Sequence, residues 1–276
     1  MIPNRGTAII AAIALASLFH APFADAVAAD RAAEQVFRNS PPRREVKERD
    51  WGPWLGPFRD KLVPSLMQDF GERYLYAPAN AALEPPRYGE KRVVFLGDSI
   101  TDRWDLKRSF PDKSYINRGI GSQVTAQMVL RFQQDVVALH PRVVVILAGV
   151  NDVQGFLQRE TVETIEQNYT AMADMADRHG IALVFGSLLP VNNYTEQAKD
   201  VLSERDPAEL RALNDWLKGF CAGRGYAYAD YYSALVDDKG LMKRDLTIDG
   251  IHPLRAGYAI MAPIAEAAIE QALDTR

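Results

Sequence analysis

Cysteine is almost absent from this sequence, since Cys221 is the only cysteine among 276 residues. An internal disulfide is therefore excluded, and the four histidines are too scattered to suggest a metal cluster. An excess of positive charge is also lacking, because 32 lysines and arginines stand against 36 aspartates and glutamates, for a formal net charge of −4. Without a strong positive field, nucleic acid is not expected to be the main partner.

Long hydrophobic runs are missing as well. The longest, residues 7–19, is shorter than the roughly 20 residues that a membrane span needs. It follows Arg5 and precedes a series of small residues, an order typical of a secretory signal peptide. We therefore expect residues 1–29 to be a signal peptide cleaved after Ala26 or Ala29, with an uncleaved anchor as the alternative. The mature protein is expected to be periplasmic or secreted, with no membrane span.

The remaining composition is that of a folded globular protein, with 47% hydrophobic, 25% charged and 9% aromatic residues. Residues 30–90 differ from the rest because proline recurs eight times among interleaved aromatic residues. Such a stretch predicts short helices rather than a long regular element, one of them over residues 31–38. Its aromatic content predicts an extension that packs on the domain formed by residues 91–276.

Regular alternation of strands and helices begins near residue 92. Apolar runs predict strands over residues 93–96, 115–117, 143–147, 181–185 and 226–228. Helical patterns cover residues 125–139, 161–178, 207–222 and 254–273. This alternation predicts an α/β fold, with a parallel sheet of five strands between two layers of helices. Ligands of such sheets bind at the carboxyl ends of the strands.

Polar and reactive residues gather at those strand ends and before the last helix. They form four segments: Gly97-Asp98-Ser99, Asn117 to Ser122, Gly149-Val150-Asn151-Asp152, and Asp249-Gly250-Ile251-His252-Pro253. Serine, histidine and carboxylate can act as nucleophile, base and orienting group, while amides stabilise an oxyanion. The serine is not in a G-x-S-x-G motif, which disfavours an ordinary α/β-hydrolase. Taken alone, Ser99 could simply cap the following helix.

The candidate catalytic histidine is chosen by eliminating the other three histidines. His20 lies in the expected signal peptide, His140 enters the third strand at the far end of the sheet, and His179 ends a helix, where imidazolium favours the dipole. His252 alone has a carboxylate three residues before it, Asp249, which a turn would bring to the imidazole ring. The alternative is that Asp249 is a surface residue capping the last helix.

The four segments in this order resemble the SGNH hydrolases, or GDSL esterase/lipase family, in particular its bacterial lysophospholipases and acyl thioesterases. The resemblance covers residues 91–274 and implies a five-stranded sheet of flavodoxin-like order. It implies that Ser99 is the nucleophile and that His252 is the general base and acid, oriented by Asp249. Asp98 and Asp152 are interpreted as acceptors that fix their loops.

The resemblance also implies an oxyanion hole built from the backbone N–H of Ser99, the side-chain amide of Asn151 and a backbone N–H of the second segment. That N–H belongs to Ser122, at a position where the family commonly has glycine, or to Gly121 if the register differs by one. Serine also has a backbone N–H, so this departure need not abolish activity, although it constrains the loop.

The function implied is that of an exported serine esterase that needs neither metal nor cofactor. Its substrates are expected to be short-acyl esters, including acetylated carbohydrate, or lysophospholipid. An exported O-acyltransferase with the same triad and a non-catalytic glycan- or lipid-binding protein are the alternatives. Trp104, Val150 and Val153 are candidate pocket residues, and could equally belong to the core. The long connection over residues 190–206 is a candidate rim of the site.

Overall fold

The computed structural model describes residues 50–157 and 159–275. The expected signal peptide, residues 1–29, and the expected helical turns over residues 31–38 lie outside the described residues. None of the helices in the described ranges is both long enough and apolar enough to cross a membrane.

The chain divides into two compact units, residues 1–56 and residues 57–276. In the described part of the first unit, the Gly52 N–H donates a hydrogen bond to the Asp50 carboxylate at 2.8 Å. The second unit contains the whole sheet and its covering helices, and the candidate site lies within it.

Five strands form a parallel sheet in the order β2-β1-β3-β4-β5. They are β1 (Val93–Gly97), β2 (Tyr115–Gly119), β3 (Val143–Leu147), β4 (Ala182–Gly186) and β5 (Ala227–Ala229). Each predicted strand is present, and the order is that of flavodoxin-like sheets, with a switch point between β1 and β3. The predicted α/β fold is therefore confirmed.

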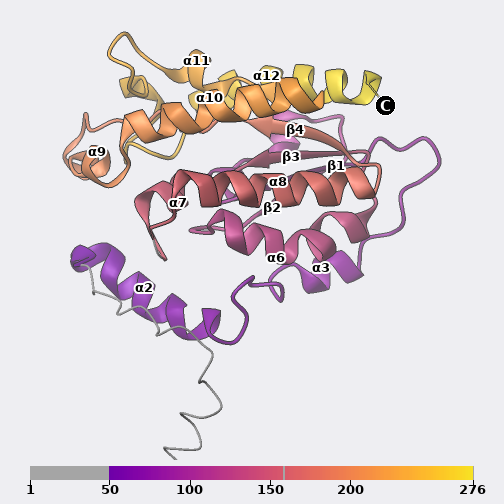
Figure 1. Cartoon of the computed structure of the whole chain (residues 1–276), viewed down its shortest axis with the longest axis horizontal. Coiled ribbons are helices and arrows are strands. Elements are labelled where there is room, and N and C mark those ends of the chain that lie inside the picture. The colour runs from indigo at the N-terminus through magenta and orange to yellow at the C-terminus, as the bar shows by residue number, and fades with distance from the viewer. Residues whose placement is uncertain (1–49, 158, 276) are drawn as a thin grey trace, which may run out of the picture. The chain divides into compact units, whose positions relative to one another are not determined.

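Helices follow the strands along the chain (Figure 1). The long ones are α2 (Gly52–Leu66), α6 (Thr125–Asp135), α8 (Val162–Arg178), α10 (Pro207–Arg224) and α12 (Arg255–Asp274). The short ones are α3 (Ala77–Ala81), α4 (Ser99–Asp102), α5 (Leu106–Ser109), α7 (Val150–Gln154), α9 (Val201–Glu204) and α11 (Tyr231–Leu235). Three 3₁₀ turns are η1 (Val137–Leu139), η2 (Glu196–Ala198) and η3 (Arg244–Leu246).

Local signals account for several helix boundaries. The Asp206 carboxylate caps α10 by accepting the Ala208 N–H at 2.8 Å, and the Thr161 hydroxyl caps α8 in the same way. The helix expected over residues 125–139 ends instead at Asp135 and continues as η1. Helix α2 contradicts the expectation of short helices only, because it runs for 15 residues through two prolines. An interior proline lacks one N–H of the helical ladder and its ring crowds the carbonyl four residues before it, which is why recurrent proline predicted breaks that α2 does not show.

Successive side chains of each strand point to opposite faces of the sheet, so the two faces pack in different hydrophobic clusters. Even-numbered residues of β1 and β3, such as Leu96 and Ile146, pack in one cluster with side chains of α6, α8 and α10. Odd-numbered residues, such as Phe95 and Val145, pack in a second cluster with side chains of α12. Every side chain of β1, β3 and β4 is buried, which explains their unbroken apolar runs.

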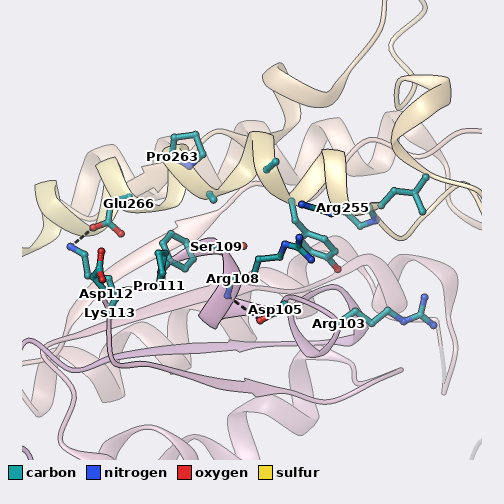
Figure 2. A pocket seen from close by; sticks show the side chains of 16 residues that line it. Arg103, Asp105, Arg108, Ser109, Pro111, Asp112, Lys113, Arg255, Pro263 and Glu266 are labelled. Atoms are coloured by element: carbon teal, nitrogen blue, oxygen red, sulfur yellow. Dashed lines mark hydrogen bonds and ion pairs between the residues drawn. The ribbon is translucent and has the colours of Figure 1, made fainter.

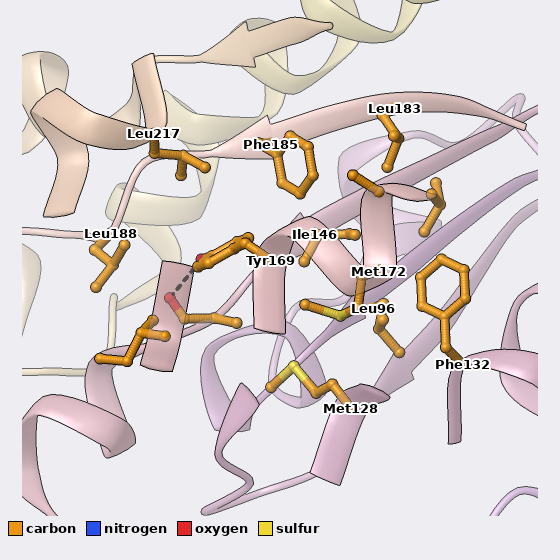
Figure 3. Packing of buried hydrophobic residues seen from close by; sticks show 14 of the residues in the cluster. Leu96, Met128, Phe132, Ile146, Tyr169, Met172, Leu183, Phe185, Leu188 and Leu217 are labelled. Carbon is orange, nitrogen blue, oxygen red and sulfur yellow. Dashed lines mark hydrogen bonds between the residues drawn. The ribbon is translucent and has the colours of Figure 1, made fainter. Parts of the chain in front are cut away.

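Figure 3 shows the first of these clusters, where Tyr169 of α8 lies among aliphatic and aromatic side chains. Its hydroxyl donates to the Ala148 carbonyl at 2.9 Å, directly after β3. The phenol is fully buried, so this bond satisfies a group that would otherwise be costly to bury. Helix α8 is thereby joined to the loop that leads to Asn151.

Candidate active site

The first element of the site is Ser99, which follows β1 directly. The Asp98 carboxylate caps α4 by accepting the Ile100 N–H at 2.9 Å, so capping is done by the residue before the serine. The Ser99 hydroxyl instead lies 2.8 Å from Nε2 of His252. These two residues are 153 positions apart in the sequence and are brought together only by the folded sheet.

The second element is the pair formed by His252 and Asp249. Nδ1 of His252 lies 2.6 Å from Oδ2 of Asp249. The other carboxylate oxygen accepts the backbone N–H groups of Ile251 and His252, at 3.1 and 2.8 Å. Burial by itself would raise the pKa of Asp249, but the hydrogen bonds from the His252 side chain and backbone outweigh it and hold this pKa well below its usual range. These contacts favour the ionised form of the Asp249 carboxyl, which lies against the imidazole ring.

The turn between these residues is supported by the connection that follows β4. Gly250 has a φ of +79°, and a Cβ at this position would lie 2.2 Å from the Asn192 carbonyl oxygen. The Asn192 N–H donates to the Gly250 carbonyl at 3.0 Å, and the Thr195 hydroxyl donates to the Ile248 carbonyl. The segment 190–206, expected as a rim, thus holds the loop that carries Asp249 and His252.

The loop after β2 passes beside the serine. A Cβ placed on Gly121 would lie 4.0 Å from the Cβ of Ser99. The next residue, Ser122, has a φ of +68°, a left-handed conformation that favours glycine. Among the described residues, neither the Ser99 N–H nor the Ser122 N–H has a hydrogen-bond acceptor. Both are available to a ligand oxygen.

Asn151 lies in the first turn of α7 and joins the same loop. Its Nδ2 donates to the Gln123 carbonyl at 3.0 Å, and because a primary amide has two N–H groups, the second one remains for a ligand. The neighbouring Asp152 is fully buried and accepts the Thr125 N–H and hydroxyl at 3.0 and 2.5 Å. These bonds hold the second and third segments together.

Residues 70–76 add a support for this loop that the sequence analysis missed. Nε2 of Gln123 donates to the Gly71 carbonyl at 3.2 Å and to the Glu72 carboxylate at 3.0 Å. The Tyr76 hydroxyl donates to the Gly119 carbonyl at 2.5 Å. Glu72 is buried with a φ of +51°, and burial raises its pKa. No local pattern identifies Glu72, because its partner lies 51 residues further along the chain.

Arg103 is a second residue that sequence reasoning missed. Its guanidinium lies 3.8 Å from Oδ2 of Asp249, the oxygen that also contacts the imidazole. Its position four residues after Ser99 was a signal for it, since one helical turn returns a side chain to the same side.

The three candidate pocket residues lie in the hydrophobic core. Trp104, Val150 and Val153 are 3, 4 and 3% exposed. Trp104 packs against the rings of Phe95 and Tyr258, with centroid distances of 5.5 and 5.4 Å. Of the two interpretations given to these residues, the structure therefore agrees with the core one, because their side chains fill the space between sheet and helices.

Asp98 provides a test of the electrostatics beneath the site. Burial raises its pKa to about 7, and Asp152 shifts in the same direction, to about 6. A carboxyl whose pKa is higher in the folded state stabilises the fold at low pH, and this contribution is lost as pH rises from about 4 to about 7. Asparagine does not titrate, so Asp98→Asn should not lose this stability as the pH rises. At about 1.4 kcal/mol per pKa unit, we expect the difference to be on the order of a few kcal/mol.

The measurement is urea denaturation of both proteins at pH 4.5 and pH 8. The stability of Asp98→Asn relative to the wild type, measured as the difference in unfolding free energy, should be greater at pH 8 than at pH 4.5. An equal difference at the two pH values would show that Asp98 is ionised throughout.

Ser122 permits a test of the loop conformation. A non-glycine residue in the left-handed region costs roughly 1 kcal/mol, so Ser122→Gly should raise the unfolding free energy by about that amount. Turnover at the site should stay within about threefold of the wild type, since the backbone N–H is retained. Ser122→Ala, which keeps the strain and lacks the hydroxyl, is the matched control. A large loss of activity in both variants would instead assign a role to the hydroxyl.

Within the described ranges, no group of three histidine, cysteine, aspartate or glutamate side chains is arranged to hold a metal ion. The groups that do converge are a hydroxyl, an imidazole, an ionised carboxylate and free amide donors. This set can attack a carbonyl carbon, move a proton and stabilise an oxyanion.

Comparison with known proteins agrees with this chemistry. Residues 95–260 match the GDSL-like Lipase/Acylhydrolase family. A GDSL-like lipase from Bacteroides thetaiotaomicron has a crystal structure with a TM-score of 0.69 and 33% identity, covering 74% of this chain and all of that one. An acylhydrolase candidate from Bacteroides fragilis also gives a TM-score of 0.69, with 32% identity over 74% of this chain and 99% of that one.

A curated relative is YqeF, an uncharacterised lipoprotein of Bacillus subtilis (strain 168). It is 28% identical over 123 residues, or 37% of this chain and 50% of the relative. The chain thus matches about half the length of this relative.

Proposed function

Because this chain belongs to the GDSL-like lipase/acylhydrolase family, and so is a carboxylic ester hydrolase, we propose that it cleaves esters through an acyl-enzyme formed on Ser99. The observation that carries the proposal is the continuous chain of contacts from the Ser99 hydroxyl to His252 and from His252 to Asp249, at 2.8 and 2.6 Å. A serine hydroxyl is a weak nucleophile unless a base of this kind accepts its proton.

In the first step the Ser99 oxygen attacks the ester carbonyl while Nε2 of His252 accepts the hydroxyl proton. The oxyanion of the tetrahedral intermediate receives hydrogen bonds from the backbone N–H groups of Ser99 and Ser122 and from the Asn151 amide. His252 then donates its proton to the departing alcohol, leaving the acyl group on Ser99. The ionised Asp249 stabilises the imidazolium that exists between these two proton transfers.

In the second step a water molecule replaces the alcohol. His252 accepts a proton from the water, hydroxide attacks the acyl carbonyl, and the proton returns to Ser99 as the carboxylic acid leaves. Neither step requires a metal or a cofactor.

The proposed substrates are short-acyl esters, including acetylated carbohydrate, or lysophospholipid. We further propose that the protein is exported to the periplasm or secreted after loss of residues 1–29. The description of the Bacillus subtilis relative as a lipoprotein supports export.

The experiment combines covalent labelling with substrate profiling of the mature protein from residue 30. A fluorophosphonate should phosphonylate Ser99 at one equivalent per chain, located by peptide mass spectrometry, and should abolish hydrolysis. A series of 4-nitrophenyl esters from acetate to palmitate should show one preferred chain length. Faster acyl transfer to an added sugar than to water would indicate an acyltransferase. A folded protein that is neither labelled nor active on any ester would contradict the proposal and favour a binding protein.

A further inference from the structure

A groove of about 870 Å³ runs along α12 (Figure 2). It lies between α12 and residues 103–113, and its walls are largely apolar, with side chains such as Phe110, Pro111 and Ala262. One end of the groove begins at Pro253, which directly follows His252. The groove therefore starts at the edge of the triad and leads away from it.

Positive charge is concentrated at this end. Figure 2 shows Arg103, Arg108 and Arg255 there, with the ion pair of Lys113 and Glu266 at the other end. Within the described part of the chain, the guanidinium groups of Arg108 and Arg255 make no hydrogen bond or ion pair. The one ion pair of the Arg103 guanidinium with a described residue is its 3.8 Å contact with Asp249.

Negative groups cancel only part of this positive charge. Asp105 lies near the arginines, where its carboxylate accepts the backbone N–H of Arg108 at 3.1 Å. Glu266 is engaged by Lys113 at 2.5 Å and by the Tyr115 hydroxyl at 2.8 Å. Asp112 lines the groove beside this pair. At the end nearest the triad, the three arginines thus face two carboxylates, Asp105 and Asp249, and Asp249 is the one in contact with Arg103.

The mechanism determines which part of a substrate meets this end. His252 must donate its proton to the leaving oxygen, so the alcohol part of the ester has to lie within hydrogen-bond distance of the imidazole. Arg103, whose guanidinium lies 3.8 Å from Asp249, and Pro253, which directly follows His252, both line the groove. An alcohol that extends from the imidazole along these residues enters the groove.

We propose that the enzyme prefers esters whose alcohol part carries an anionic group, a carboxylate or a phosphate, bound by Arg108 and Arg255 with Arg103 beside them. This inference rests on the proposed function and names the substrate class of the same site. The planar guanidinium matches both anions because it donates two parallel N–H groups. The apolar wall formed by Phe110, Pro111 and Ala262 packs against the carbon skeleton of the alcohol.

The test compares acetate esters that differ only in the charge of the alcohol. One pair is 3-(acetoxymethyl)benzoate and the corresponding benzamide, and the other is acetylated glycerol 3-phosphate and acetylated glycerol. The wild type should show a kcat/KM about tenfold higher for the anionic member of at least one pair. The pair with the larger ratio distinguishes a carboxylate substrate from a phosphate substrate.

Variants then assign the preference to the arginines. The double variant Arg108→Gln/Arg255→Gln should lower the anionic-to-neutral ratio to about 1–2 through a fall in the kcat/KM of the anionic ester, since both exposed side chains would bind the anion. Lys113→Gln removes one positive charge at the far end and should leave the ratio unchanged. A wild type without preference, or a double variant that keeps it, would overturn the inference. Neutral-ester hydrolysis that depends on Ser99 would still uphold the proposed function in either case.

Discussion

Replacing Ser99 by alanine is expected to lower kcat for ester hydrolysis by about 10⁵- to 10⁶-fold, because the nucleophile is lost while the oxyanion donors remain. Among the described residues, the Ser99 hydroxyl contacts only His252. Its removal should therefore change the unfolding free energy by less than about 1 kcal/mol. The measurement is kcat and KM on the preferred 4-nitrophenyl ester, together with thermal unfolding.

Ser203→Ala is the control for this substitution, since Ser203 is an exposed serine whose hydroxyl donates to the Asp200 carbonyl at 2.7 Å. It should retain wild-type kinetics. If Ser99→Ala kept more than about one per cent of the wild-type rate, the acyl-enzyme on Ser99 would be refuted, because residual catalysis from the remaining groups is far smaller.

Replacing Asp249 by asparagine should lower kcat by about 10⁴-fold with little change in KM. An amide nitrogen in place of Oδ2 would donate to Nδ1 of His252 and move the imidazole proton to Nε2, the atom that must accept the Ser99 proton. The pKa of Asp249 lies well below its usual range, so the wild-type carboxyl is expected to stay ionised throughout the pH range of the assay. The acid limb of the wild-type pH–rate profile is therefore not expected to report this carboxyl.

The matched control is Asp245→Asn, which makes the same change on an exposed aspartate four residues earlier. Stopped-flow measurement of the acylation burst would locate the defect in the first chemical step. Loss of less than tenfold in Asp249→Asn would mean that the 2.6 Å contact with His252 has no catalytic role.

Residues 70–76 support the loop after β2, which carries the proposed oxyanion donor Ser122. Gly71 and Glu72 contact the Gln123 side chain, and the Gln123 carbonyl in turn accepts a hydrogen bond from Asn151. The part of the proline- and aromatic-rich stretch that precedes β1 is thus connected to the proposed oxyanion donors through one residue. The proposed boundary of the hydrolase domain at residue 91 follows the family resemblance, whereas these contacts extend the supporting structure to earlier residues.

Short-range features of the sequence predicted the architecture closely. Unbroken apolar runs identify β1, β3 and β4 because both faces of a parallel sheet are buried, and Asp206 and Thr161 mark helix starts because a cap bonds an N–H two or three residues away. The pairing of Asp249 with His252 belongs to the same class, since one turn brings residues three apart into contact.

Other features depend on chain segments that meet only after folding. The contact of Ser99 with His252, the packing of Trp104 into the core, and the hydrogen bond from Gln123 to Glu72 join positions that no periodicity relates. The left-handed conformation of Ser122 is likewise imposed by neighbours, because serine by itself disfavours it. Local preferences reach only as far as a turn or a strand, whereas the distances between catalytic groups, and the charge gathered beside them, arise from packing of the whole sheet and its helices.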